Sequence, residues 1–164
     1  PRIQPDCSTQ RFLGQEESRM KRREGEPWMP ATDYAHSLRG LGVNLVSGDL
    51  DRALEFQREV LGVEIIYSDA DFAALRGFGS EWMIHADHTY TGHPLETLLG
   101  QIPKRGGTVE LRLHGCDPDI AESRARKRGF NVLQRATDRP HGLREAYLFD
   151  GDGYLWVADV PVPV

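Results

Sequence analysis

The sequence has no long apolar run and no excess of basic residues. No stretch of its 164 residues approaches the roughly 20 apolar residues that a membrane-spanning helix needs, and its first residues lack the apolar core of a secretory signal. Lys and Arg number 20 against 25 Asp and Glu, which gives a formal net charge of −5. We therefore expect neither a membrane nor nucleic acid as the main partner.

Cysteine is also scarce. Cys7 and Cys116 lie far apart in the chain and no Cys-x-x-Cys pair occurs. Such usage is typical of a reducing compartment in which thiols stay free, so we expect a cytoplasmic protein. The 39% apolar share and the length suffice for one domain with a substantial core.

Residues 1–38 differ in composition from the rest and are predicted to form an N-terminal arm or extension. They contain a mixed charge run at 15–24, in which acidic residues flank the basic cluster Lys21-Arg22-Arg23, and only sparse large apolar residues. Two interpretations remain open. The arm is either flexible or draped over the surface, or it crosses onto a partner subunit and is anchored there by Trp28 or Tyr34.

From residue 39 to 164 the pattern predicts a folded domain with the order β-α-β-β-β, repeated once. In each copy an Asp precedes a helix as its N-cap and a Gly ends that helix: Asp49 and Gly62, then Asp117 and Gly129. The predicted strands cover 41–46, 63–67, 72–78 and 81–90 in the first copy, and 108–113, 130–134, 145–149 and 154–160 in the second.

The spacing of glycines indicates a duplication. Gly48 and Gly115, which precede the two helices, are separated by the same 67 positions as Gly62 and Gly129. We therefore predict an α+β fold with two tandem βαβββ modules, at about 40–92 and 105–161. The modules would form a curved eight-stranded sheet with the helices outside and a concave cup inside. That cup is the default binding site.

Three segments resemble a known family. They are Asp49-Leu50-Asp51-Arg52-Ala53-Leu54-Glu55-Phe56 with Val60-Leu61-Gly62; Asp117-Pro118-Asp119; and Pro140-His141-Gly142-Leu143-Arg144-Glu145 with the turn Asp150-Gly151-Asp152-Gly153-Tyr154-Leu155-Trp156. In this order and spacing the chain resembles the glyoxalase/bleomycin-resistance/dioxygenase (vicinal oxygen chelate) superfamily over residues 40–161. Gln57 departs from the resemblance, because an aromatic residue is usual there.

The resemblance implies four metal-ligand positions inside the cup. They fall on Gly42 (or Leu41), on His85, on Glu110 (or Thr108) and on Val157. Glycine, leucine and valine have no donor atom, whereas a catalytic divalent site needs about three protein ligands. We therefore expect no cofactor and no metal ligands, with a divalent metal as the alternative.

Strand alternation selects the residues that face the cup. Trp82 and Trp156 are out of phase and are predicted to lie in the core or at a subunit interface, while Val109, Leu111 and Leu113 are predicted to pack under the helix. His141 lies on a loop at the mouth. The candidate ligand-binding residues are Asn44, His85, Asp87, Glu110, Arg112, Tyr147, Asp159 and His141, and the candidate catalytic residues are His85 and Glu110.

The leading hypothesis is a small-molecule-binding protein of this superfamily that holds an organic ligand with polar or cationic substituents, without metal and without turnover. The resemblance implies a homodimer, and whether modules pair within or between chains stays open. The alternative is a lyase, isomerase or dioxygenase-like enzyme that uses His85 and Glu110, with or without a divalent metal. A third possibility is a structural or regulatory partner with a vestigial cup.

Overall fold

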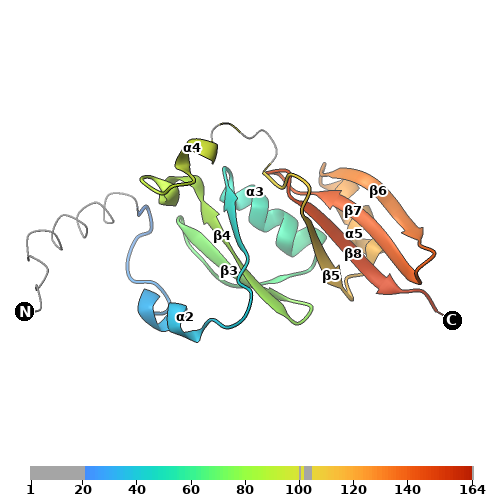
Figure 1. The fold of residues 1–164 in the computed structure, drawn as a ribbon, viewed down its shortest axis with the longest axis horizontal. Coiled ribbons are helices and arrows are strands. Elements are labelled where there is room, and N and C mark those ends of the chain that lie inside the picture. Colours follow the sequence, from blue (N-terminus) through green and yellow to red (C-terminus); the bar gives the residue numbers. More distant parts are fainter. Residues whose placement is uncertain (1–20, 100, 102–104, 164) are drawn as a thin grey trace, which may run out of the picture.

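The structure is a computed structural model that describes residues 21–99, 101 and 105–163. These residues fold as two βαβββ modules in tandem, each with one mixed four-stranded sheet and a helix packed against it (Figure 1). The predicted α+β fold class with tandem modules is confirmed. The eight strands found among the described residues divide into two hydrogen-bonded sheets.

The first module holds sheet A. It runs β1 (Asn44–Ser47), α3 (Leu50–Glu55), the π-helical turn η1 (Phe56–Val60), β2 (Glu64–Ser68), β3 (Phe72–Gly77) and β4 (Ser80–Ala86). The strand order is β1-β4-β3-β2, with β1 parallel to β4 and the other neighbours antiparallel.

The second module holds sheet B and repeats this order. It runs β5 (Glu110–His114), α5 (Pro118–Lys127), β6 (Asn131–Asp138), β7 (Leu143–Phe149) and β8 (Leu155–Pro161), with the strand order β5-β8-β7-β6. Between the modules lie the 3-10 turn η2 (Asp87–Tyr90) and the short helix α4 (Glu96–Leu99).

Local sequence signals set both ends of each helix. The Asp49 side chain accepts a hydrogen bond from the backbone N–H of Arg52, and Asp117 accepts from two backbone N–H groups at the start of α5. Gly62 and Gly129 have φ angles of 73° and 71°, a conformation that a residue with a Cβ adopts only at a cost. The predicted N-caps and helix ends are confirmed.

Several predicted strand ends are wrong: besides a late start of β1 at Asn44 and a longer β6 that reaches Asp138, two lie near candidate site residues. The strand predicted over 81–90 ends at Ala86, and Asp87 begins η2, in which the Thr89 hydroxyl donates to the Ala86 carbonyl at 2.8 Å. Val109 was expected to pack under the helix, but β5 begins only at Glu110, and Val109 is 60% exposed. In both cases the hydrogen-bonded strand is shorter than the stretch that the sequence pattern predicted.

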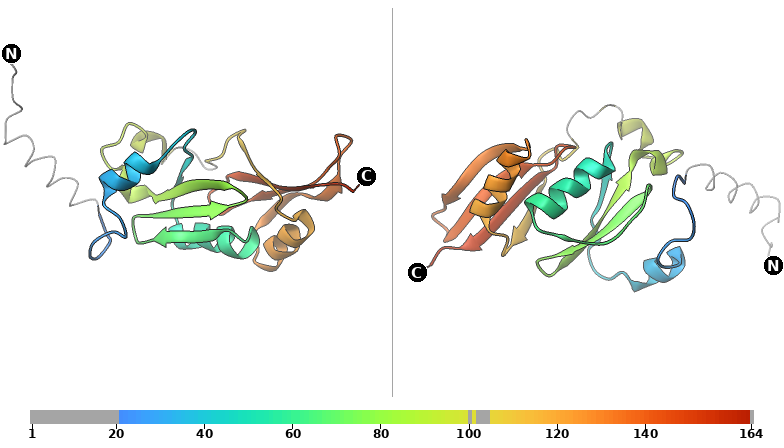
Figure 2. Two further views of the ribbon diagram at one scale, coloured as in Figure 1. Left: turned by 90° about the horizontal axis from the view of Figure 1, so that it is seen from below. Right: turned by 180° about the vertical axis from the view of Figure 1, so that it is seen from behind.

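The two helices lie on one side of the molecule and the sheets on the other. Edge-on, α3 and α5 run side by side beneath the strands (Figure 2). Arg128 at the end of α5 binds Glu55 at 3.0 Å and Glu59 at 2.7 Å across the helix pair. The open faces of sheets A and B therefore point to the same side of the chain.

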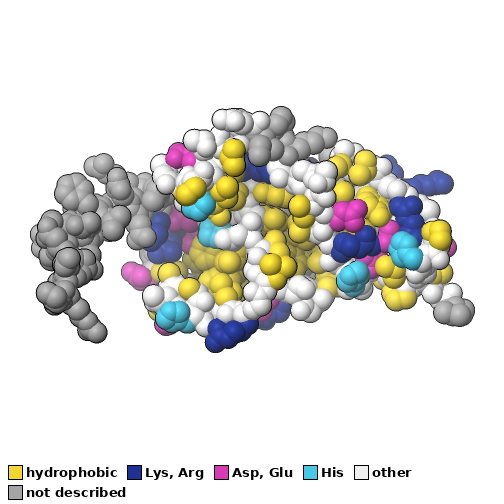
Figure 3. Space-filling model, viewed as in Figure 1, with side chains coloured by type: hydrophobic (Ala, Val, Ile, Leu, Met, Phe, Trp, Pro, Cys, Tyr) yellow, Lys and Arg dark blue, Asp and Glu magenta, His cyan; other side chains and the backbone are white. Residues whose placement is uncertain are grey.

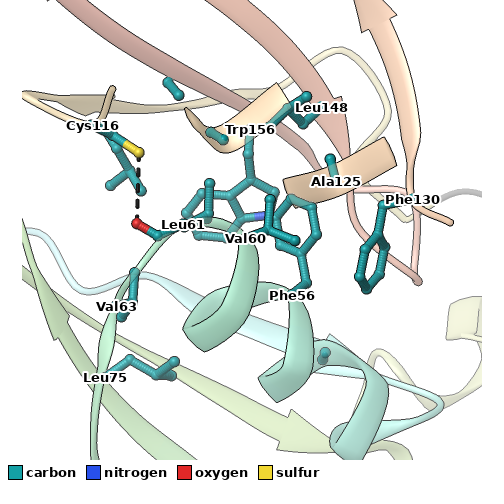
Figure 4. Close-up of a cluster of buried hydrophobic side chains, with 14 of the residues drawn as sticks. Phe56, Val60, Leu61, Val63, Leu75, Cys116, Ala125, Phe130, Leu148 and Trp156 are labelled. Atoms are coloured by element: carbon teal, nitrogen blue, oxygen red, sulfur yellow. Dashed lines mark hydrogen bonds between the residues drawn. The ribbon is translucent and has the colours of Figure 1, made fainter. Parts of the chain in front are cut away.

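One core joins the modules behind the sheets (Figure 4). Phe56 of the first module lies edge-on to Phe130 of the second, with ring centroids 4.9 Å apart. Trp82 and Trp156 are 6% and 2% exposed and 5.6 Å apart, so the structure places both in the core. Cys116 is a free buried thiol, and Cys7 lies outside the described residues.

A polar junction fixes the modules against each other. The predicted Asp150-Gly-Asp-Gly turn is confirmed as the β7–β8 hairpin turn, and Asp152 in it accepts from the Ser47 hydroxyl at 2.5 Å and the Gly48 backbone N–H at 2.9 Å. Arg105 of the connector donates to the Val46 carbonyl at 2.9 Å and pairs with Asp87. The end of β1 is therefore held by groups of the second module and the connector.

No helix among residues 21–99, 101 and 105–163 is long and apolar enough to cross a membrane.

Candidate functional site

His85 lies on the open face of sheet A. Along β4, Trp82, Ile84 and Ala86 are buried, whereas Met83 and His85 between them point to the other face. In register, His85 is flanked by Val46 of β1 and Phe72 of β3. Strand alternation therefore places this histidine where the sequence predicted it.

Aromatic rings enclose His85 on two sides. Phe72 stacks on it with centroids 5.4 Å apart and planes inclined by 22°, and Tyr90 of η2 meets it edge-on at 6.0 Å. His93 in turn lies edge-on to Tyr90 at 4.7 Å. Such rings offer an apolar wall for another flat molecule.

The His85 imidazole forms no hydrogen bond with any described residue. Burial lowers its pKa, and the nearby carboxylates of Asp69 and Asp71 only partly oppose this shift. The ring is therefore neutral near pH 7 and carries one free donor and one free acceptor nitrogen. A polar group that is partly desolvated and unpaired is suited to a ligand.

A cavity of about 320 Å³ opens beside this histidine. Its volume lies at the small end of the range typical of small-molecule sites, about 300–1,000 Å³. The space-filling view shows a hollow with hydrophobic and histidine side chains at the end of the molecule that holds the first module, on the left (Figure 3). The cavity is lined by Lys21, Arg23, Asp71, Phe72, His85, Thr89, Tyr90 and His93.

Asp71 connects the cavity to the N-terminal arm. Its Oδ1 accepts from the backbone N–H of Arg22 at 2.6 Å and is 2.9 Å from His88 Nε2. Burial alone would raise the pKa of Asp71, but these hydrogen bonds hold that pKa below its ordinary value. Asp71 therefore stays ionised and ties residues 21–23 to the rim.

The open face of sheet B is polar and organised around Glu145 on β7. Its carboxylate, 1% exposed, accepts from Tyr147 Oη at 2.8 Å, Arg139 Nε at 3.2 Å and Arg112, and lies 3.0 Å from His141 Nε2. Although burial opposes ionisation, hydrogen bonds from Tyr147, His141 and Arg112 lower the pKa of Glu145 to about 2. Glu145 is therefore ionised at neutral pH, and the surrounding hydrogen-bond donors hold its carboxylate in place.

Asp159 on β8 is the second buried carboxylate of this face. It pairs in register with Glu145 and is also 1% exposed. It accepts from Arg112 at 3.3 Å and lies 2.7 Å from His114 Nδ1. Arg112 thus bridges both carboxylates, and each exposed histidine of this face is oriented by one of them.

The structure divides the predicted site residues between the two sheets. Glu110, Arg112, Tyr147, Asp159 and His141 all belong to the polar face of sheet B, and Glu110 also pairs with Arg112 at 3.1 Å. On sheet A, His85 lines the cavity. Asn44 is exposed at the start of β1, and Asp87 pairs with Arg105 at the junction; neither lines this cavity.

Several site residues were missed from the sequence. His114 is in phase with Glu110 and Arg112, so strand alternation could have found it. Lys21 and Arg23 reach the cavity from the arm, and Phe72 and Tyr90 from strand ends and turns. No local pattern in the sequence marks these four as neighbours of His85.

The residues at the four family metal positions do not fit a metal ion. Gly42 has no donor atom, and Val157 is a fully buried hydrocarbon side chain. His85 and Glu110 line different cavities. The described part of the chain contains no group of three or more His, Cys, Asp or Glu placed to hold a metal ion.

Solved structures with the same fold support this architecture. A glyoxalase/bleomycin resistance protein/dioxygenase from Nocardioides is 23% identical with a TM-score of 0.57, covering 80% of this chain and 92% of its own. TioX from Micromonospora sp. ML1 is also 23% identical, with a TM-score of 0.54 and coverages of 77% and 98%. Lactoylglutathione lyase from Agrobacterium tumefaciens is 17% identical, with a TM-score of 0.54 and coverages of 74% and 92%.

No curated protein sequence matches the chain. The model of the Glyoxalase/Bleomycin resistance protein/Dioxygenase superfamily matches residues 41–158, which cover both modules except the end of β8. The chain therefore belongs to the glyoxalase/bleomycin resistance protein/dioxygenase superfamily.

Proposed function

We propose that the protein binds a small organic molecule in the aromatic cavity of sheet A, without the family's usual metal and without converting it. One observation carries this proposal: a neutral His85 with no hydrogen-bond partner among the described residues lies between two aromatic rings, at the wall of a cavity of about 320 Å³. An aromatic wall with one convergent polar group is typical of a ligand site.

We further propose that the protein is a cytoplasmic homodimer with the site shared between subunits. Both open faces point to one side of the chain, so neither covers the other within one subunit (Figure 2). A twofold axis would place the polar face of sheet B of the partner over the aromatic face of sheet A. The ligand would then meet aromatic rings on one side and donors such as Arg112 and His141 on the other.

The alternative is a lyase, isomerase or dioxygenase-like enzyme. It is favoured by His114 and His141, each held by a buried carboxylate in the way that orients a general base. Lactoylglutathione lyase from Agrobacterium tumefaciens also shares the fold. Within one chain His85 and Glu110 line separate cavities, so the pair could act together only across two subunits.

The test is a thermal-shift screen of flat aromatic compounds on the full chain, followed by mass spectrometry of each compound that stabilises it. We expect stabilisation that Tyr90→Ala weakens and that the exposed edge variant Leu133→Ala leaves unchanged, and recovery of the compound intact after long incubation. If the wild type forms a product and His85→Gln still binds the compound but forms none, the enzyme alternative is favoured. A screen in which no compound responds to Tyr90→Ala would refute the binding function.

A further inference from the structure

We propose that residues 21–38, which precede the family domain, are part of the ligand site, and that Lys21 and Arg23 select a flat aromatic ligand that carries a negative charge. This proposal rests on the binding function proposed above and assigns its ligand class. It narrows the ligand with polar or cationic substituents that the sequence favoured to an anionic one, because the arm adds two cations which strand alternation could not place.

The arm is fixed to sheet A at separate points. The Arg22 backbone N–H donates to Asp71 at 2.6 Å. Trp28 stacks on Tyr67 of β2 with centroids 5.1 Å apart and planes inclined by 29°, and Tyr34 of α2 (Ala31–Ser37) lies 6.5 Å from Phe72, the ring that also stacks on His85. The arm therefore belongs to the same aromatic cluster as the cavity wall.

The charges that line the cavity favour an anion. Lys21 and Arg23 both line it, and neither forms an ion pair with a described carboxylate. The only acidic residue in the lining is Asp71, whose Oδ1 is already engaged by His88 and by the Arg22 backbone and whose Oδ2 is buried. A ligand carboxylate or sulfonate would give the two cations a partner that the described chain does not provide.

The rest of the molecule would act against such a preference. The chain carries a formal net charge of −5, so its overall field attracts cations and repels anions. A measured preference for an anion over a neutral molecule of the same shape must therefore come from local groups. Lys21 and Arg23 are the basic side chains in the cavity lining.

Two fluorescent probes with nearly the same skeleton test the proposal. Anilinonaphthalene sulfonate is a flat aromatic anion, and phenylnaphthylamine is its uncharged counterpart without the sulfonate. We expect the full chain to bind the anion about tenfold more tightly, as one charge-assisted contact would give. The double variant Lys21→Gln/Arg23→Gln should lose that preference while its affinity for the neutral probe stays within about twofold.

A matched control removes two cations elsewhere. Lys127 and Arg135 are exposed on the second module and form no ion pair with a described residue, so Lys127→Gln/Arg135→Gln should keep the preference. Tyr90→Ala should weaken both probes, which locates them in the cavity.

The outcomes separate the two proposals. If both probes respond to Tyr90→Ala but bind equally, or if the Lys21/Arg23 variant keeps the preference, the anionic ligand class is refuted and the binding site stands. If neither probe responds to Tyr90→Ala, the site itself is refuted. Loss of the preference in the Lys127/Arg135 control would also refute the role of the arm, because the overall charge would then explain it.

Discussion

Glu145 is an anion that the fold surrounds with donors before any ligand arrives. Four side chains from two strands and one loop contact its carboxylate, among them Arg112 and His141. A buried carboxylate without partners would be strongly destabilising, so these contacts are needed for folding. They also hold the donor groups of sheet B in fixed positions, which is a requirement for recognition.

Replacement of this carboxylate should expose its contribution to stability. We expect Glu145→Gln to lower the free energy of unfolding by about 2–4 kcal/mol at pH 7, because Arg112 and Arg139 lose a buried charged partner. Urea denaturation measures this. Glu110→Gln, which removes an exposed partner of the same Arg112, should cost less than about 1 kcal/mol.

The effect of Glu145 should depend on pH in a defined direction. Its pKa is lowered from an ordinary value of 4.5 to about 2, so the folded state binds the proton less well than the unfolded state. The stabilisation is therefore complete above about pH 4.5 and is lost as the pH falls toward 2. The difference between the wild type and Glu145→Gln should stay constant from pH 6 to about pH 4.5 and shrink from there to pH 3, and a constant difference over the whole range would contradict this origin.

Gln57 presents the opposite case, a buried polar group that nothing in the described chain satisfies. It is 0% exposed in the turn η1, and neither its Nε2 nor its Oε1 has a hydrogen-bond partner among the described residues. Desolvating an unpaired amide costs about 1–3 kcal/mol. A residue of similar volume without polar atoms should avoid that cost.

We therefore expect Gln57→Met to raise the free energy of unfolding by about 1 kcal/mol. Chemical denaturation with a linear extrapolation measures this, and Arg58→Met, at the exposed neighbouring position, is the control with little expected change. A loss of stability in Gln57→Met would show that the amide is hydrogen-bonded, for instance to a buried water, and would contradict the expectation.

At the scale of elements, the helices and the duplication could be predicted because their signals are local. Asp49 and Gly62, and likewise Asp117 and Gly129, act within one helical turn of the residues they cap or stop. The inward face of β5, β7 and β8 followed from alternation, which placed Glu110, Arg112, Tyr147 and Asp159 on one side. The predicted strand ends were less accurate, because hydrogen bonding to the neighbouring strand decides where a strand stops, and residue propensity does not.

The aromatic cavity could not be predicted, because its walls come from separate segments. Phe72 and Tyr90 meet His85 only after the hairpin and η2 have formed, and Lys21 and Arg23 lie in a segment with no regular pattern. The sequence therefore located His85 but not its surroundings. It also treated the cup as one surface, whereas the chain presents its aromatic and polar groups on two separate sheets.

The arm should be held in place mainly by Trp28. Its ring stacks on Tyr67 and meets Tyr34 edge-on at 5.1 Å, so it connects the arm to sheet A. We expect Trp28→Ala to speed trypsin cleavage after Lys21, Arg22 and Arg23 several-fold, because proteolysis tracks local opening.

The overall free energy of unfolding should fall by much less than the roughly 3–5 kcal/mol typical of a core tryptophan, because Trp28 packs outside the core cluster. Met29→Ala, at the exposed neighbouring position, is the control and should leave cleavage unchanged. Equal cleavage rates in Trp28→Ala and the wild type would mean that the arm is held by other contacts.

At the scale of the whole molecule, the junction determines how a closed site can arise. Asp152 binds the end of β1 through Ser47 and Gly48, and Arg105 joins the connector to the same point. Together with the shared core behind the sheets, these contacts fix both modules with their open faces on one side. One sheet cannot fold over the other without breaking them, so in the proposed homodimer the partner chain would close the site.

A mixing experiment tests closure between subunits. Light scattering should give about twice the chain mass of 18.5 kDa. The variant Tyr90→Ala impairs the aromatic face, and the variant His114→Ala/His141→Ala impairs the polar face. These side chains are exposed or half-buried, so their loss should leave the core intact. Each homodimer should bind phenylnaphthylamine weakly. After mixing by mild denaturation and refolding, random exchange should restore about a quarter of the sites, because half the dimers are mixed and each has one site with two intact faces.

Two outcomes would contradict the shared site. If mixing restores no binding, the two faces act within one chain. If the His114→Ala/His141→Ala homodimer binds as tightly as the wild type, sheet B is not part of the site.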